Sequence, residues 1–241
     1  MTDSTDGDDA RDAGHALRRR GAERITATDR YGILLCLLFV TFVFMASAPS
    51  GPGARVVTVA LQGLTLLVAV SVAGARRRFA RLVQVVVVVA FAGAVVSVFI
   101  NTNLNGDGVF FGLNFLLVGA APVLLARAIW RRRVIDVQTV MGAICIYVLI
   151  GLLFAFAYGA IADLGSTAFF AEQSHASPAD FVYFSFVTLS TVGYGDLTAA
   201  HSLGRSFSAL EGMLGQLYLV TVVAVTVGKM SAGDRDELPG P

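Results

Sequence analysis

Long apolar stretches separated by short polar connections dominate the chain. A helix needs about 20 apolar residues (roughly 17 to 25) to cross a membrane. Six stretches meet this requirement: Tyr31–Ala48, Val56–Ala75, Leu82–Ile100, Val109–Ile129, Val137–Ala162 and Gly204–Gly228. The run Val85–Val89 is β-branched and would favour a strand in a soluble protein. Inside an apolar span, however, a helix satisfies its own backbone hydrogen bonds. The pattern therefore predicts an all-α membrane protein with six transmembrane helices.

Basic residues mark alternate connections between these spans. The basic connections carry Arg18, Arg19, Arg20, Arg24 and Arg30, then Arg76, Arg77, Arg78 and Arg81, then Arg131, Arg132 and Arg133. The other connections hold only Arg55, then no basic residue, then Arg205. Because cytoplasmic loops collect Lys and Arg, we expect a multi-pass protein of the cell membrane with both termini in the cytoplasm.

Composition agrees with a membrane location. Hydrophobic residues make up 56% of the chain and charged residues 15%, whereas about a quarter of a soluble domain is charged. We therefore expect lipid as a partner, and no nucleic acid. Residues 1–30, acidic first and then basic, predict a disordered cytoplasmic tail and do not resemble a signal peptide. Residues 229–241 predict a short cytoplasmic tail. Cys36 and Cys145 lie in apolar runs and suggest packing rather than a disulfide.

The connection between the fifth and sixth spans contains a short helix that cannot cross a membrane. Ser177, Pro178 and Asp180 form a helix start, with an N-cap residue, a proline at the first position and a capping acid. The helical run from Pro178 to Ser190 has only about thirteen residues, which suits a re-entrant half-membrane helix. The partial negative charge at its C-terminal end favours a cation just beyond it, where Thr191–Gly195 follows.

The segment Thr188-Leu-Ser-Thr-Val-Gly-Tyr-Gly-Asp196 resembles the signature of potassium channels. The resemblance implies K⁺ bound by the backbone carbonyls of Thr191, Val192, Gly193 and Tyr194 and by the Thr191 hydroxyl. Gly193 and Gly195 supply backbone angles that other residues reach poorly. Val192 and Tyr194 then point away from the pore. We expect this segment to be the selectivity filter.

The same resemblance assigns support of the filter to neighbouring residues. Asp196 matches the carboxylate at the extracellular mouth, Tyr183 and Phe184 stand where aromatic partners of the filter tyrosine belong, and Thr188 opens the signature. Some relatives have a glutamate four residues before the filter threonine as partner of the mouth aspartate. Val187 occupies that position here, so filter inactivation is expected to differ.

Residues 31–133 occupy the place of a voltage-sensing domain, and residues 134–228 form the expected pore domain of outer helix, pore helix, filter and inner helix. A voltage sensor needs several charges in its fourth helix, because each charge supplies about 2.3 kcal/mol per 100 mV. The fourth span carries Arg127 alone, and Pro122 is expected to kink it. We therefore predict weak or absent voltage dependence.

The sixth span contains candidates for gating. Gly215, and secondarily Gly212, match a hinge glycine, with close helix packing as the alternative. Gln216 is a candidate cavity-facing group. Glu211 is an ionisable residue within a span, where such groups are costly and usually functional. It could be a neutral acid behind the pore helix, a partner of Arg205, or a pH sensor; we favour the first role.

Other functions fit the sequence less well. A nonselective cation channel would lack the Tyr194–Gly195 pair, and a secondary transporter would show paired broken helices. An intramembrane enzyme would need catalytic groups inside the spans, but His15, His175 and His201 lie outside them; a pair between His201 and Ser202 stays open.

The chain has a single filter segment, and one strand cannot enclose an ion. We therefore expect a homotetramer around a fourfold axis. We expect a passive K⁺ channel with no enzyme activity and no cofactor besides the permeant ion.

Overall fold

A computed structural model describes residues 31–47, 51–74, 77–100, 106–130, 137–165 and 167–236. Across these residues every regular element is helical, apart from an isolated bridge between Phe170 and Ala199. The all-α prediction is confirmed for this part of the chain. The predicted disordered tail 1–30 lies outside the described residues, as do residues 237–241.

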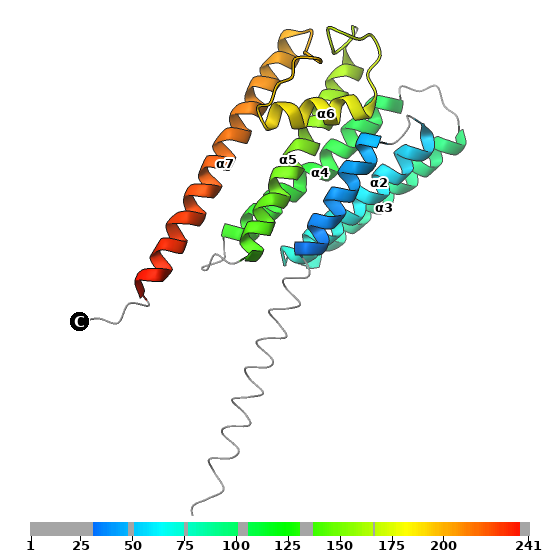
Figure 1. Cartoon of the computed structure of the whole chain (residues 1–241). Coiled ribbons are helices and arrows are strands. Elements are labelled where there is room, and N and C mark those ends of the chain that lie inside the picture. Colours follow the sequence, from blue (N-terminus) through cyan, green and yellow to red (C-terminus); the bar gives the residue numbers. More distant parts are fainter. Residues whose placement is uncertain are drawn as a thin grey trace, which may run out of the picture.

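The helices follow the predicted spans in order (Figure 1). Their bounds are Tyr31–Ser47, α2 Pro52–Val72, α3 Arg77–Ile100, α4 Gly106–Trp130, α5 Val137–Leu164, α6 Pro178–Leu189 and α7 Ser202–Asp236. The β-branched run Val85–Val89 is helical within α3, as the membrane argument predicted.

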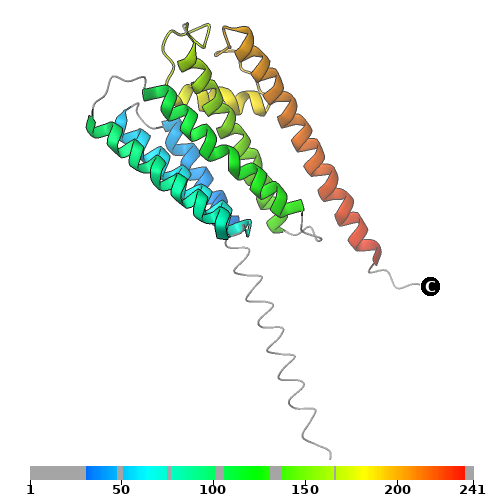
Figure 2. The same ribbon diagram turned by 180° about the vertical axis from the view of Figure 1, so that it is seen from behind.

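The helix Tyr31–Ser47 and α2 to α5 run alongside one another, and α7 stands at the other side of α5 (Figures 1 and 2). The short α6 lies across the space between α5 and α7 near one end of the molecule. α4 packs against both α2 and α5. The core at this junction is built from buried leucines, namely Leu34, Leu38, Leu117, Leu125, Leu149 and Leu152. The helix Tyr31–Ser47 also reaches α6 directly, with the Phe42 and Phe186 ring centroids 4.6 Å apart.

The lengths and surfaces of the helices suit an apolar environment. Two segments, Gly53–Val72 and Gln138–Leu164, are long and apolar enough to cross a membrane. Shorter apolar stretches lie at Tyr31–Ser47, Ala80–Gly93 and Asn114–Trp130. α3 exposes Val85, Val88 and Val89, which are 59%, 62% and 64% accessible. A continuous exposed valine face is unfavourable in water and suits contact with lipid.

The end of α7 departs from the expected span. α7 continues past Gly228 to Asp236, so part of the predicted tail 229–241 is helical. The reason is that hydropathy reports where apolar residues stop, whereas a helix ends where its backbone hydrogen bonds stop. A polar sequence after an apolar span can therefore extend the same helix.

Candidate functional site

The candidate site begins with the short helix α6, whose start is fixed by a complete capping box. The Asp180 amide donates to Ser177 Oγ over 3.3 Å, and the Ser177 amide donates to Asp180 Oδ2 over 2.7 Å. Pro178 fills the first helical position, where no amide donor is needed. The helix has 12 residues, which is about 18 Å at 1.5 Å per residue. It therefore ends well short of the length needed to cross a membrane.

In residues 191–195, which follow α6, left-handed and right-handed backbone conformations alternate. Thr191, Gly193 and Gly195 have positive φ of 57°, 54° and 78°, whereas Val192 and Tyr194 do not. In an extended strand successive carbonyls point to opposite sides, but alternation of left- and right-handed residues allows them to share one side. Glycine adopts positive φ without steric cost, which explains its presence at two of the three positions. Thr191 is the only non-glycine residue with positive φ within the described residues.

The amide groups at the start of this segment turn back onto α6. Thr191 N–H donates to the Thr188 carbonyl at 2.9 Å, and Val192 and Gly193 N–H donate to the Val187 carbonyl at 3.0 and 3.3 Å. Across a trans peptide the carbonyl points opposite to the following N–H. The carbonyls of Thr191 and Val192 therefore point away from α6, which leaves them available as ligands on the opposite side.

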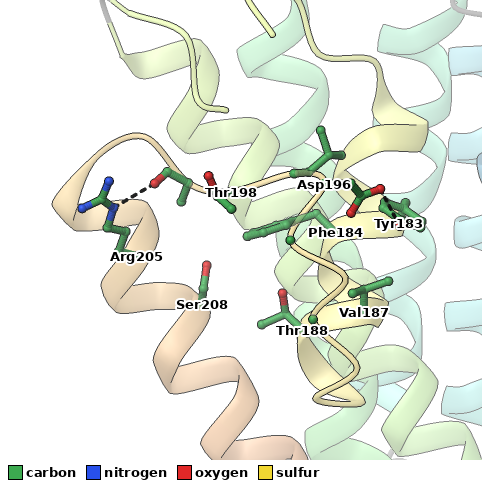
Figure 3. Close-up of a pocket in the computed structure, with 12 residues that line it drawn as sticks. Tyr183, Phe184, Val187, Thr188, Asp196, Thr198, Arg205 and Ser208 are labelled. Atoms are coloured by element: carbon green, nitrogen blue, oxygen red, sulfur yellow. Dashed lines mark hydrogen bonds between the residues drawn. The ribbon is translucent and has the colours of Figure 1, made fainter. Parts of the chain in front are cut away.

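Tyr183 supports the outer end of the segment in two ways. Its hydroxyl donates to Asp196 Oδ2 over 2.7 Å, and its ring stacks on Tyr194 with centroids 6.5 Å apart and planes 5° from parallel. Figure 3 shows Tyr183 and Asp196 turned toward each other. The ring contact was predicted from the sequence, whereas the hydrogen bond was not. A sequence signal for this hydrogen bond did exist. Tyr183 lies one helical turn before Val187, the position at which some relatives have a glutamate that pairs with the aspartate corresponding to Asp196.

Phe184 lies in a cluster of aromatic side chains. Its buried ring lies 5.1 Å from Tyr158, 6.1 Å from Phe169 and 5.2 Å from Phe170, between centroids. These contacts belong to an aromatic cluster between α5, α6 and the loop that joins them. Phe184 therefore anchors α6 to this cluster within the single chain, and its support of the filter tyrosine stays a prediction.

A cavity of about 560 Å³ separates the filter segment from the start of α7 (Figure 3). Thr188, Val187 and Phe184 line it from α6, and Arg205 and Ser208 line it from α7. The predicted support residue Thr188 thus lies behind the filter, where its carbonyl also holds the first filter amide.

The chain after the filter is held by the loop that follows α5. Phe170 and Ala199 form an antiparallel bridge. The Glu172 carboxylate accepts hydrogen bonds from the Thr198 amide at 2.8 Å and the Thr198 hydroxyl at 2.5 Å. These two bonds stabilise the ionised form and lower the pKa of Glu172 below its usual range. The exit of the filter is thereby tied to a fixed loop.

Glu211 of α7 is fully buried and joins three helices. Tyr158 of α5 donates its hydroxyl to Glu211 Oε2 over 2.6 Å. Ser185 Oγ of α6 lies 2.5 Å from Glu211 Oε1 and 2.6 Å from the Gly151 carbonyl oxygen. One serine proton cannot serve two acceptors. A proton on the Glu211 carboxyl satisfies both contacts. Glu211 then donates a hydrogen bond to the Ser185 hydroxyl, and Ser185 donates to the Gly151 carbonyl. The contacts thus favour a neutral acid behind α6, the first of the roles considered for Glu211.

Arg205 does not pair with Glu211 in this arrangement. Its Nε donates to the Ala199 carbonyl over 3.0 Å at the outer end of α7. This agrees with the six-residue spacing of Arg205 and Glu211 along one helix, which does not favour a pair within a single subunit.

The two glycines expected to act as hinges meet the filter region differently. A Cβ on Gly215 would lie 2.2 Å from the Leu189 carbonyl oxygen, so α7 packs directly against the end of α6 there. A Cβ on Gly212 would lie 3.6 Å from the Thr188 carbonyl oxygen, an ordinary contact. The packing alternative therefore has a structural basis at Gly215, while a hinge at either position stays a prediction. Gln216 Nε2 donates to Thr191 Oγ1 over 2.7 Å.

Among the described residues, no group of three or more His, Cys, Asp or Glu side chains is suited to hold a metal. His201 Nε2 lies 2.6 Å from Thr167 Oγ1 and 3.0 Å from the Ala168 carbonyl oxygen. The histidine thus engages the loop after α5 rather than Ser202.

Residues 146–232 match a family described as "Ion channel". The match runs from within α5 through α6 and the filter segment to within α7. No curated protein is similar enough in sequence to count as a match. The family match supports passive ion conduction by this part of the chain, and with the apolar helices it supports a membrane protein.

Proposed function

We propose that the chain is one subunit of a potassium-selective channel whose opening depends weakly or not at all on voltage. The observation that carries the proposal is the alternating backbone of residues 191–195, with its amides bonded to α6 and its first carbonyls turned away. A row of carbonyls on one side can replace the hydration shell of a K⁺ ion.

The ligands in this proposal are the carbonyls of Thr191, Val192, Gly193 and Tyr194, with the Thr191 hydroxyl. Gly193 and Gly195 permit the backbone, and Tyr183 with Asp196 braces its outer end. The C-terminal end of α6 adds a partial negative charge beside the cytoplasmic end of the row. Selectivity for K⁺ over Na⁺ then depends on how well four such rows match the larger ion.

A homotetramer completes the site. Val192 and Tyr194 are 53% and 72% exposed in the single chain, and α7 exposes Met213, Leu217 and Val220 at 63%, 62% and 64%. These residues belong to the filter and to the helix beside it, so neighbouring copies around a fourfold axis would cover them and enclose the ion.

The weak voltage dependence rests on α4. Arg127, in its last turn, is the basic residue of this helix. The core of the first helices holds uncharged polar side chains instead, including buried Thr41, Gln62 and Thr65. A single charge near a helix end moves little charge across the field.

A flux assay in reconstituted vesicles tests this function. Vesicles loaded with K⁺ and diluted into Na⁺ medium should become negative inside and take up a tracer cation. Vesicles loaded with Na⁺ and diluted into K⁺ medium should become positive inside and should not concentrate the tracer. Gly193→Ala should abolish the flux, because φ of 54° strains an alanine. Gly93→Ala is the matched control, since its added Cβ would meet nothing within 4 Å. Equal flux for K⁺ and Na⁺ would support a nonselective cation pore instead.

A further inference from the structure

A side chain of α7 contacts the filter segment directly. Gln216 Nε2 donates a hydrogen bond to Thr191 Oγ1 over 2.7 Å. Both residues are exposed in the single chain, on the side that neighbouring subunits would enclose. The contact lies at the end of the filter nearest to the C-terminus of α6. It therefore joins the inner helix to the first residue of the proposed ion pathway.

Thr191 is held in an unusual conformation. Its φ of 57° lies in the left-handed region, which a β-branched residue rarely adopts. Its amide is fixed by the Thr188 carbonyl, and its side chain has few favourable χ1 rotamers. Backbone outliers of this kind persist where the surroundings over-determine them and often mark functional positions. The Gln216 amide is one of the groups that constrain the side chain.

The position of Gln216 is itself fixed by packing. The preceding residue, Gly215, lies against the Leu189 carbonyl so closely that a Cβ would come within 2.2 Å of it. α7 therefore lies in close backbone contact with the end of α6 at this point and cannot move nearer to it. The carboxamide of Gln216 is thus presented at a set height relative to Thr191.

The chemistry of a hydroxyl defines what this contact does. A threonine oxygen has two lone pairs and one proton. The N–H of the Gln216 side chain donates to one lone pair of the Thr191 hydroxyl. The second lone pair and the proton must therefore point elsewhere. With this donor in place the hydroxyl has a restricted orientation, whereas without it the hydroxyl rotates and can present its proton to an approaching cation.

We propose that Gln216 is a positioning residue for the cytoplasmic end of the filter: it orients the Thr191 hydroxyl so that its remaining lone pair is a ligand for the entering cation. This role rests on the proposed channel function. It acts at one end of the filter, so it affects entry of ions from the cytoplasmic side and leaves entry from the outside unchanged.

The test is the dependence of single-channel current on K⁺ concentration, measured separately from each side of a bilayer. Gln216→Leu keeps the approximate size and removes the donor. We expect the cytoplasmic K⁺ concentration for half-maximal current to rise about two- to tenfold, the value of one neutral hydrogen bond. The external half-maximal concentration should not change. Gln84→Leu makes the same substitution at an exposed glutamine of α3 and should change neither value.

A double-mutant cycle separates positioning from general packing. Thr191→Val removes the hydroxyl but keeps the branched shape, so Gln216→Leu should have no further effect in that background. If either variant conducts too little current, the K⁺-dependent rise of the thermal midpoint in detergent replaces the current, and the same non-additivity is expected.

Three outcomes would overturn the proposal: an unchanged cytoplasmic half-maximal concentration, equal changes on both sides, or full additivity with Thr191→Val. A wild-type protein that does not select K⁺ would instead refute the proposed function. The cycle, measured with whichever cation is carried, would still report whether Gln216 acts through the Thr191 hydroxyl.

Discussion

Replacement of Glu211 tests the link between the three helices around the filter. In Glu211→Leu the Tyr158 hydroxyl loses its acceptor, while Ser185 keeps the Gly151 carbonyl. A buried hydroxyl without its partner costs about 1–3 kcal/mol, and the lost Ser185 contact adds about 0.5–1.5 kcal/mol. We therefore expect Glu211→Leu to reduce the free energy of unfolding by about 2–4 kcal/mol per subunit.

Glu211→Gln should behave differently because an amide reproduces the contacts of a protonated carboxyl. Its oxygen accepts from Tyr158, its N–H donates to Ser185, and the loss should stay below about 0.5 kcal/mol. The assay is unfolding in mixed detergent micelles, with Asp163→Asn as an exposed carboxylate control near the end of α5. Infrared spectra supply a second readout, since wild type should show a protonated carboxyl band that Glu211→Gln lacks.

Two results would refute this reasoning. Equal destabilisation by Glu211→Gln and Glu211→Leu would show that the site needs a charge and not a neutral donor. The absence of an infrared band that disappears in Glu211→Gln would show that the carboxyl carries no proton.

Gly215→Ala should destabilise the assembled protein by about 1–3 kcal/mol, because the added methyl group overlaps a backbone carbonyl; a thermal midpoint equal to wild type would contradict this packing. Tyr183→Phe removes the hydrogen bond to Asp196 and should speed the decay of sustained current about two- to tenfold, with unchanged decay as the opposing result. The lowered pKa of Glu172 means that its tie to Thr198 is complete above the ordinary glutamate value of about 4.3 and is lost as pH falls below it. Hydrogen exchange at the Thr198 amide should therefore rise only in acid, and Glu172→Gln should remove this step.

The sequence predicted the helices well because the membrane imposes a simple length and polarity rule. Apolar runs of sufficient length coincide with helices in the described chain, and the overridden strand preference of Val85–Val89 is one example. The ends of α7 were less predictable. Its continuation to Asp236 follows from backbone hydrogen bonding, which hydropathy does not report.

Individual site residues were predictable only where a local motif specified them. The capping box of α6 and the glycines with positive φ follow from short-range rules. The hydrogen bond from Tyr183 to Asp196 and the one from Gln216 to Thr191 join residues 13 and 25 positions apart.

Longer-range contacts depend on how α5, α6 and α7 pack, which no local pattern encodes. The Tyr158 and Ser185 partners of Glu211 were hidden for the same reason, although a lone carboxyl in an apolar helix did indicate that partners exist.

The reversal potential of purified protein in a planar bilayer under opposed K⁺ and Na⁺ gradients tests the central claim most directly. Our account predicts a reversal close to the K⁺ equilibrium potential and an open probability that stays flat over a wide voltage range. A reversal near zero would contradict it, because the carbonyl row of residues 191–195 would then not distinguish K⁺ from Na⁺.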